Sequence, residues 1–102
     1  MSNAQKSLLF NLRSQCENNF KDNFHNMHEN NICPHCKQGP NSQKHALSCK
    51  VIALHLSQVD KEAIQDIKYE DIHGDSQAQL LITQVYQSII SIKKRLLKSV
   101  HP

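Results

Sequence analysis

Three cysteines and one histidine lie close together in the sequence at spacings typical of a metal site. They are Cys33, Cys36, His45 and Cys49, in the pattern C-x2-C-x8-H-x3-C. Two cysteines separated by two residues form a tight turn that directs both thiolates at one ion, and residues four apart share a helical face. Three thiolates and one imidazole complete the tetrahedron that Zn²⁺ prefers. The sequence predicts one structural zinc ion, against the alternative of free thiols or a disulfide.

Four protein ligands would leave no coordination position for water or substrate, which a catalytic zinc requires. Zinc deaminases also need a glutamate beside the first ligand, and no acidic residue lies between residues 30 and 59. The sequence contains no nucleophile–base pair and no phosphate-binding loop that we recognise. We therefore expect a chain that is not an enzyme and takes no small-molecule substrate.

Other histidines and one cysteine compete as ligands. His35 lies between the two cysteines of the turn, where adjacent side chains diverge, so we expect it to face solvent. Cys16, His25 and His28 could form part of a second site, or could be a buried thiol and two surface histidines. The sequence leaves both interpretations open.

Helical periodicity and few glycines and prolines, two and three, predict a mainly α chain. We expect a small zinc-stabilised helical domain, in which the cysteine turn packs on a ligand-bearing helix and a long C-terminal helix follows. The expected parts of this single domain are an N-terminal helix (1–16), an asparagine-rich connection (17–31), the zinc module (32–58), a short helix and turn (59–74), and the long helix with its tail (75–102).

Polar residues before the apolar stripes predict where the helices begin. Ser42 follows a Gly-Pro-Asn turn and should cap one helix over residues 43–57. Asp60 should cap the next helix, and Asp75 or Ser76 the longest one.

The longest helix carries two adjacent apolar rows, which must be buried against something. Burial in the chain's own core is the simpler outcome, and a homodimer or protein-partner interface is the alternative. The interface row would be Leu81, Val85, Ile89, Ile92 and Leu96.

Charge is distributed unevenly around a net value of +3. Residues 30–59 carry Lys37, Lys44 and Lys50 and no acid. With His35, these lysines would meet phosphates, so RNA or DNA is the expected partner. No aromatic residue lies between residues 25 and 68 to stack on a base, which favours backbone contacts over base readout.

Neither a secretory signal nor an apolar run of about 18–20 residues stands out in the sequence. We therefore expect no membrane association and an intracellular chain, nuclear or cytoplasmic. In a reducing compartment, clustered cysteines are more often metal ligands than disulfides.

Three segments in order resemble the region after the polymerase in non-LTR (LINE-type) retrotransposon reverse transcriptases: RSQCENNFKDNF, CPHC with QKHALSCKVI, and IKYEDIHGD before a long aliphatic helix. The resemblance covers about residues 13–99. It implies a CCHC zinc domain, as a fragment of such a polyprotein or a host-domesticated derivative, that contacts RNA or target DNA. Its most specific residues are Cys33, Pro34, Cys36, His45, Leu47, Cys49, Tyr69, Asp71 and Gly74.

The chain departs from this pattern at three positions that are not ligands. Lys44 stands where glutamate is common, Ala46 where leucine is common, and His73 where an aromatic residue is usual. They leave open whether the family's nucleic-acid surface is kept. The YEDI segment lacks the paired aspartates of a polymerase, so Tyr69 is expected to be a packing anchor and Asp71 a cap or turn residue.

Overall fold

Helices make up the regular structure of the part of the chain that the computed structural model describes, residues 1–14 and 32–100. Within these residues there is no strand, and a single isolated bridge pairs Ile32 with Pro40. The mainly α prediction is confirmed. The elements are α1 (Asn3–Arg13), α2 (Gln43–Ala46), α3 (Lys50–His55), α4 (Gln58–Asp66), the 3-10 helix η2 (Tyr69–His73) and α5 (Ser76–Val100).

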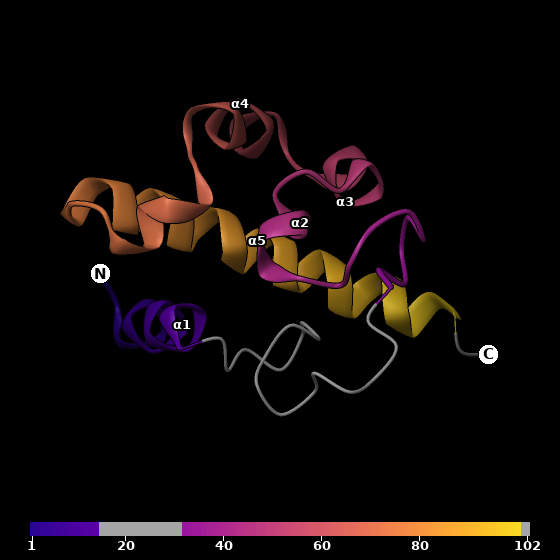
Figure 1. Cartoon of the computed structure of the whole chain (residues 1–102), viewed down its shortest axis with the longest axis horizontal. Coiled ribbons are helices and arrows are strands. Elements are labelled where there is room, and N and C mark those ends of the chain that lie inside the picture. The colour runs from indigo at the N-terminus through magenta and orange to yellow at the C-terminus, as the bar shows by residue number, and fades with distance from the viewer. Residues whose placement is uncertain (15–31, 101–102) are drawn as a thin grey trace.

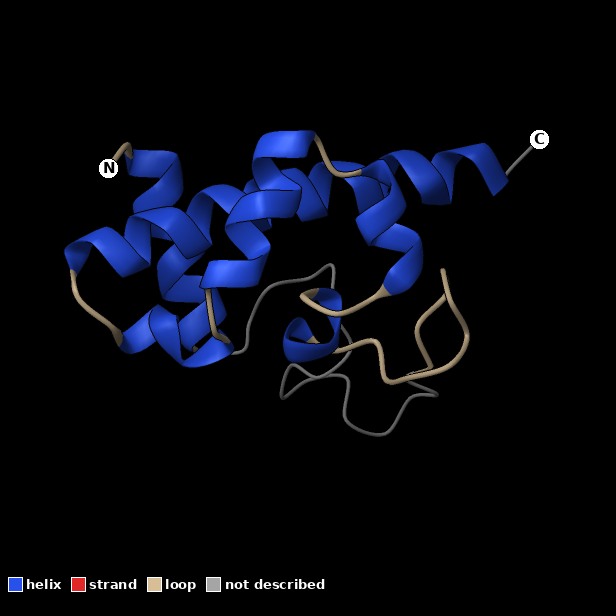
Figure 2. Ribbon diagram, turned by 90° about the horizontal axis from the view of Figure 1, so that it is seen from above, coloured by secondary structure: helices blue, strands red, loops and turns tan. Residues whose placement is uncertain are grey.

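Helix α5 is the element on which the others pack. Its 25 residues span about 37 Å at about 1.5 Å per residue, close to the longest dimension of the molecule, 38 Å. Figure 1 shows α1 on one side of α5, with α3 and α4 on the other. The view in Figure 2, turned by 90°, shows helices and loops and no strand in the described part of the chain.

The core is one cluster to which α5 contributes most. Ile82, Tyr86 and Ile89 of this helix are fully buried. Residues from the other elements that complete the cluster include Leu9, Leu12, Ile52, Leu56, Ile67 and Ile72. Two of the predicted zinc ligands, Cys33 and Cys49, belong to the same cluster.

The apolar row proposed as an interface lies in this core. Val85, Ile89 and Ile92 are at most 5% exposed, and Leu81 and Leu96 are partly buried against the cluster. The chain itself therefore covers Val85, Ile89 and Ile92, whereas Leu81 and Leu96 keep part of their surface exposed. The homodimer or protein-partner interface at this row stays a prediction.

Two of the three predicted helix caps are confirmed, at α2 and α5. Ser42 caps α2 by accepting the His45 N–H, and Asp75 accepts the Ala78 N–H at the start of α5. The prediction of Asp60 as a cap is wrong, because Ser57 caps α4 and accepts the Asp60 N–H at 3.2 Å. Both side chains can cap a helix, and Ser57 starts it one turn earlier.

The single helix expected over residues 43–57 is divided in two. Helix α2 ends at Ala46, and α3 begins at Lys50 after an extended Cys49 with φ −67° and ψ 120°. The Ser48 N–H bonds to the His45 carbonyl at 2.8 Å in the intervening turn. The apolar spacing that predicted one helix runs through both pieces, so it could not reveal the break between them.

The buried Gln43, at the start of α2, forms hydrogen bonds with three other elements. The Gln43 side-chain amide donates to the Leu12 carbonyl at 2.9 Å and to the Tyr69 hydroxyl at 2.8 Å. The Tyr86 hydroxyl of α5 donates to the Gln43 carbonyl at 2.5 Å. This network fixes the start of α2 against α1, η2 and α5, and it gives Tyr69 the packing role expected of it.

Candidate metal centre

The structure brings the four predicted ligands together. The sulfur and nitrogen atoms that Cys33, Cys36, His45 and Cys49 offer all lie within 4.8 Å of one another. The Cys33 and Cys49 sulfurs are 3.9 Å apart, and the Cys36 sulfur is 3.2 Å from His45 Nε2. A tetrahedral zinc with Zn–S bonds of about 2.3 Å separates two sulfurs by about 3.8 Å. The cluster can hold a metal ion, and its donor set fits zinc.

The turn that carries the first two cysteines is closed by backbone hydrogen bonds. The Cys33 N–H donates to the Gly39 carbonyl at 2.7 Å, and the Lys37 N–H donates to the Cys33 carbonyl at 3.0 Å. Lys37 has a φ of 59°, in the left-handed region that asparagine and glycine adopt most easily. These bonds fold the segment back so that Cys33 and Cys36 face the same point.

Gly39 lets the His45 ring approach this turn. A Cβ atom added at Gly39 would lie 2.7 Å from His45 Cε1 and 2.8 Å from Nδ1, closer than such atoms can pack. The backbone of His45 is also held in place, because its N–H donates to the Ser42 hydroxyl. The sequence showed Gly39 only as a turn residue, and its role beside the ring depends on the fold.

Hydrogen bonds from backbone N–H groups act to lower the pKa values of the two buried thiols, Cys33 and Cys49, against the effect of burial. Burial opposes ionisation of Cys33, but hydrogen bonds from the Cys36 and His35 N–H groups outweigh it, so the pKa of Cys33 is lowered. At Cys49 burial dominates and raises the pKa, although hydrogen bonds from the Ile52 and Val51 N–H groups oppose it. N–H groups directed at sulfur are the outer support that thiolate–metal sites need.

Burial of the four ligands is uneven. Cys33 and Cys49 are 1% and 2% exposed, whereas Cys36 and His45 are half-buried. The half-buried pair lines a surface hollow of about 390 Å³ with Lys50 at its edge. The remaining residues of this hollow are His35, Gln38, Ser48 and Val51.

His35 does not face solvent as expected. It is half-buried, and its Nε2 is buried without a hydrogen-bond partner. Burial, followed by the positive charge of Lys93, lowers the pKa of His35 below its ordinary value. A neutral ring supplies no positive charge, so His35 is a poor candidate for the phosphate contact predicted from sequence. The charge of Lys93, on α5, acts on this ring, which the local sequence around the turn does not indicate.

The three lysines named as nucleic-acid contacts are all exposed. Lys37 lies in the cysteine turn, Lys44 on α2, and Lys50 on the first turn of α3. Each is thus carried by a segment that also carries a ligand of the metal cluster.

Lys93 begins the basic run Lys93, Lys94 and Arg95, a pattern typical of cations near the C-terminus of a helix, and the structure buries it. Lys93 is 2% exposed, and its Nζ donates to Asn41 Oδ1 at 3.0 Å. The sequence does contain a signal for this burial, because Lys93 follows Ile89 by four residues and Tyr86 by seven, on the core face of α5.

The possible second metal site at Cys16, His25 and His28 lies outside the described residues. Within residues 1–14 and 32–100, the cluster that contains Cys33 is the one group of three or more histidine, cysteine, aspartate or glutamate side chains that could share an ion.

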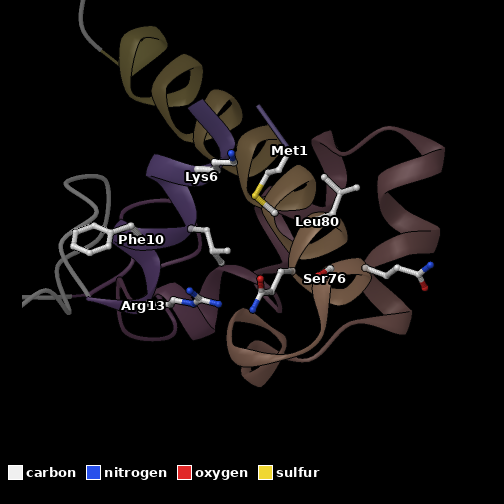
Figure 3. Close-up of a pocket in the computed structure, with 9 residues that line it drawn as sticks. Met1, Lys6, Phe10, Arg13, Ser76 and Leu80 are labelled. Carbon is white, nitrogen blue, oxygen red and sulfur yellow. The ribbon is translucent and has the colours of Figure 1, made fainter. Parts of the chain in front are cut away.

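A larger cavity lies elsewhere, between α1 and the start of α5. Its volume is about 670 Å³, and Figure 3 shows Met1, Lys6, Phe10 and Arg13 of the first segment around it, with Leu80 of α5. Phe10 is 68% exposed. The cavity shares no residue with the metal cluster, and its lining combines four apolar side chains, two cations and three uncharged polar side chains.

No helix of the described part of the chain combines the length and the apolar character needed to cross a membrane. Comparisons with protein-family models, with curated proteins and with solved structures give no match. The resemblance to the retrotransposon region therefore stays a prediction.

Proposed function

We propose that this chain is a non-catalytic zinc-binding module whose basic surface beside the metal centre binds the phosphate backbone of RNA or DNA. The observation that carries the proposal is the placement of Lys37, Lys44 and Lys50. All three are exposed, and all three are on segments that the metal would hold in place. Residues 32–59 contain no acidic side chain to neutralise them.

The structural role of zinc follows from the number of donors. Three thiolates and one imidazole saturate a tetrahedral ion, so the metal would fix the fold and leave no position for a substrate. Cys33 and Cys49 are core residues, which couples metal binding to folding. Native mass spectrometry should find one zinc per chain, and the Cys36→Ala variant should lose the ion and the thermal stabilisation by zinc. A parent chain that takes up no zinc would refute this part.

Nucleic-acid binding is tested by matched charge removal. A variant with Lys37→Asn, Lys44→Ala and Lys50→Ala removes the three positive charges, and asparagine tolerates the left-handed backbone of Lys37. The control carries Lys6→Ala, Lys61→Ala and Lys68→Ala, which are exposed lysines on other segments. Both variants change the net charge equally.

Labelled single- and double-stranded RNA and DNA would be titrated with each protein over a series of salt concentrations. Loss of three phosphate contacts should reduce the slope of log affinity against log salt by about two to three. The control should keep the parent's slope. No binding by the parent, or equal weakening in both variants, would reject the assigned surface.

A partner-protein role is the second candidate, and the cavity between α1 and α5 favours it. The apolar side chains of its lining and the exposed Phe10 suit an amphipathic peptide. Lys6 and Arg13 favour a peptide with acidic residues over a second copy of this chain, because the chain itself carries a net positive charge. Titration with a labelled Leu/Glu amphipathic helix would test it, because Phe10→Ser should abolish binding. Light scattering that gives a dimer for the parent and a monomer for Phe10→Ser would instead identify a second copy as the occupant.

The first candidate function, nucleic-acid binding, agrees with an origin in a non-LTR retrotransposon polyprotein, as a fragment or a domesticated derivative. The support for this origin is the resemblance of the cysteine–histidine segment and the IKYEDIHGD turn. A nuclear location would follow from a DNA target and a cytoplasmic one would suit RNA, which a fluorescent fusion of the chain can distinguish.

A further inference from the structure

Lys93 is a buried cation beside a cluster of thiols. Every other lysine in the described residues is exposed, whereas Lys93 is 2% exposed. Its Nζ reaches Asn41 Oδ1 at 3.0 Å, and Asn41 belongs to the loop between the ligands Cys36 and His45. In Figure 1 this loop, the magenta segment before α2, passes over the C-terminal half of α5. The amino group of Lys93 is therefore fixed against the metal-site segment.

Burial of an ammonium group costs several kcal/mol unless opposite charge stabilises it. Burial lowers the pKa of Lys93, and the negative charges of Cys33 and Cys49 act in the opposite direction and raise it. The two sulfurs that act on the lysine are the two buried ligands of the cluster. The lysine and the thiolates therefore lie close enough to stabilise each other.

The net charge of the zinc-bound site explains why a single cation can neutralise it. Three thiolates carry three negative charges and Zn²⁺ carries two positive ones, so with a neutral histidine the loaded centre keeps one negative charge. One ammonium group neutralises it.

We propose that Lys93 is the counter-charge of the metal centre, which holds the three-thiolate zinc site by neutralising its excess negative charge and ties α5 to metal binding. This inference rests on the zinc part of the proposed function and is independent of nucleic-acid binding. Lys93 acts as a positioning residue for charge and is not a ligand.

Lys93→Met tests the proposal, because methionine fills a similar volume without charge. Zinc affinity would be measured by competition with a chromophoric chelator. The expected result is a loss of about tenfold to hundredfold, the usual effect of removing support around a metal site. Lys94→Met is the matched control, since Lys94 is the exposed neighbour on the same helix, and its zinc affinity should equal that of the parent. Parent-like affinity in Lys93→Met would overturn the inference.

A double-mutant cycle separates charge from packing. Cys36→His keeps four donors but removes one thiolate, so the loaded site becomes neutral. Lys93→Met should then weaken zinc binding less than it does in the parent. Equal losses in the two backgrounds would mean that Lys93 only packs, and would overturn the inference.

The remaining outcomes are also decisive. If Lys93→Met does not fold in saturating zinc but Lys93→Arg does, the charge is required and the inference stands. If neither variant folds, the lysine is needed for its shape and the inference fails. A parent chain that binds no zinc overturns both the zinc proposal and this one, whereas a zinc-binding parent with an unaffected Lys93→Met overturns this one alone.

Discussion

Replacing Gly39 with alanine should weaken zinc binding while leaving the rest of the fold in place. The added Cβ atom would lie 2.7 Å from His45 Cε1 and 2.8 Å from Nδ1. An ordinary contact needs about 3.4 Å, so the ring must move by about 0.7 Å. Gly39 does not have a positive φ, so its backbone accepts alanine without strain. The steric effect on the ring is thus the main consequence.

The expected loss follows from the tolerance of a zinc site. Zinc–ligand distances lie within about 0.2 Å of their ideal values, so a ring displaced by about 0.7 Å must distort the site or pull the turn with it. We expect zinc affinity to fall about tenfold to hundredfold, which corresponds to about 1.4–2.8 kcal/mol. Without metal the His45 ring can rotate away from the new methyl group, so stability in a chelator should change much less.

Chelator competition measures the affinity, and thermal melts with zinc and with EDTA measure its effect on stability. A loss of this size should lower the Tm in zinc by about 5 °C or more for a chain of this length. Gly74→Ala is the control, because its Cβ atom would meet Ala78 Cβ at 3.2 Å and the Asp71 carbonyl at 3.3 Å, in a turn without ligands. Parent-like zinc affinity in Gly39→Ala, or an equal loss in both variants, would refute the reasoning.

Three further predictions concern the ligand Cys49, the half-buried ring of His35 and the buried hydroxyl of Tyr86. Cys49→Ser should abolish the rise in Tm on adding zinc, because the hydroxyl is a poor replacement for a thiolate ligand. The pKa of His35 is lowered in the folded chain, so the unfolded chain binds more protons as pH falls below about 6.5, and stability falls with it. Urea denaturation in excess zinc should show a smaller loss between pH 7.5 and 5.5 for His35→Asn than for the parent, and equal losses would contradict this. Tyr86→Phe removes the hydroxyl that donates to the buried Gln43 carbonyl, so urea denaturation should show a loss of stability of about 1–3 kcal/mol.

The ligand set and the starts of α2 and α5 could be predicted because they depend on short spacings. The four ligands lie within 17 residues, and Ser42 and Asp75 cap helices through residues three positions away. Such contacts are present in the local sequence. The break between α2 and α3, where Cys49 has extended backbone, was missed because the apolar stripe continues across it.

Buried polar residues were the main part of the site that the sequence did not reveal. Gln43 and Lys93 are polar by type, and composition alone places such residues at the surface. Their partners lie far along the chain, at Leu12 for Gln43 and at Asn41 for Lys93. Only the position of Lys93 on the apolar face of α5 gave a local signal, and the adjacent Lys94 and Arg95 obscured it by suggesting a basic helix end.

The burial of these two residues indicates that the metal module is part of the core. Gln43 connects the start of α2 to α1, η2 and α5, and Lys93 connects the ligand loop to the other half of α5. Through these hydrogen bonds at Asn41 and Gln43, both between the ligands Cys36 and His45, metal binding would be linked to packing of the long helix. Since three exposed lysines lie on the ligand-bearing segment, zinc would fix the basic surface relative to the whole helical core. A change in α5 can in this way alter the metal site and its surface without touching a ligand.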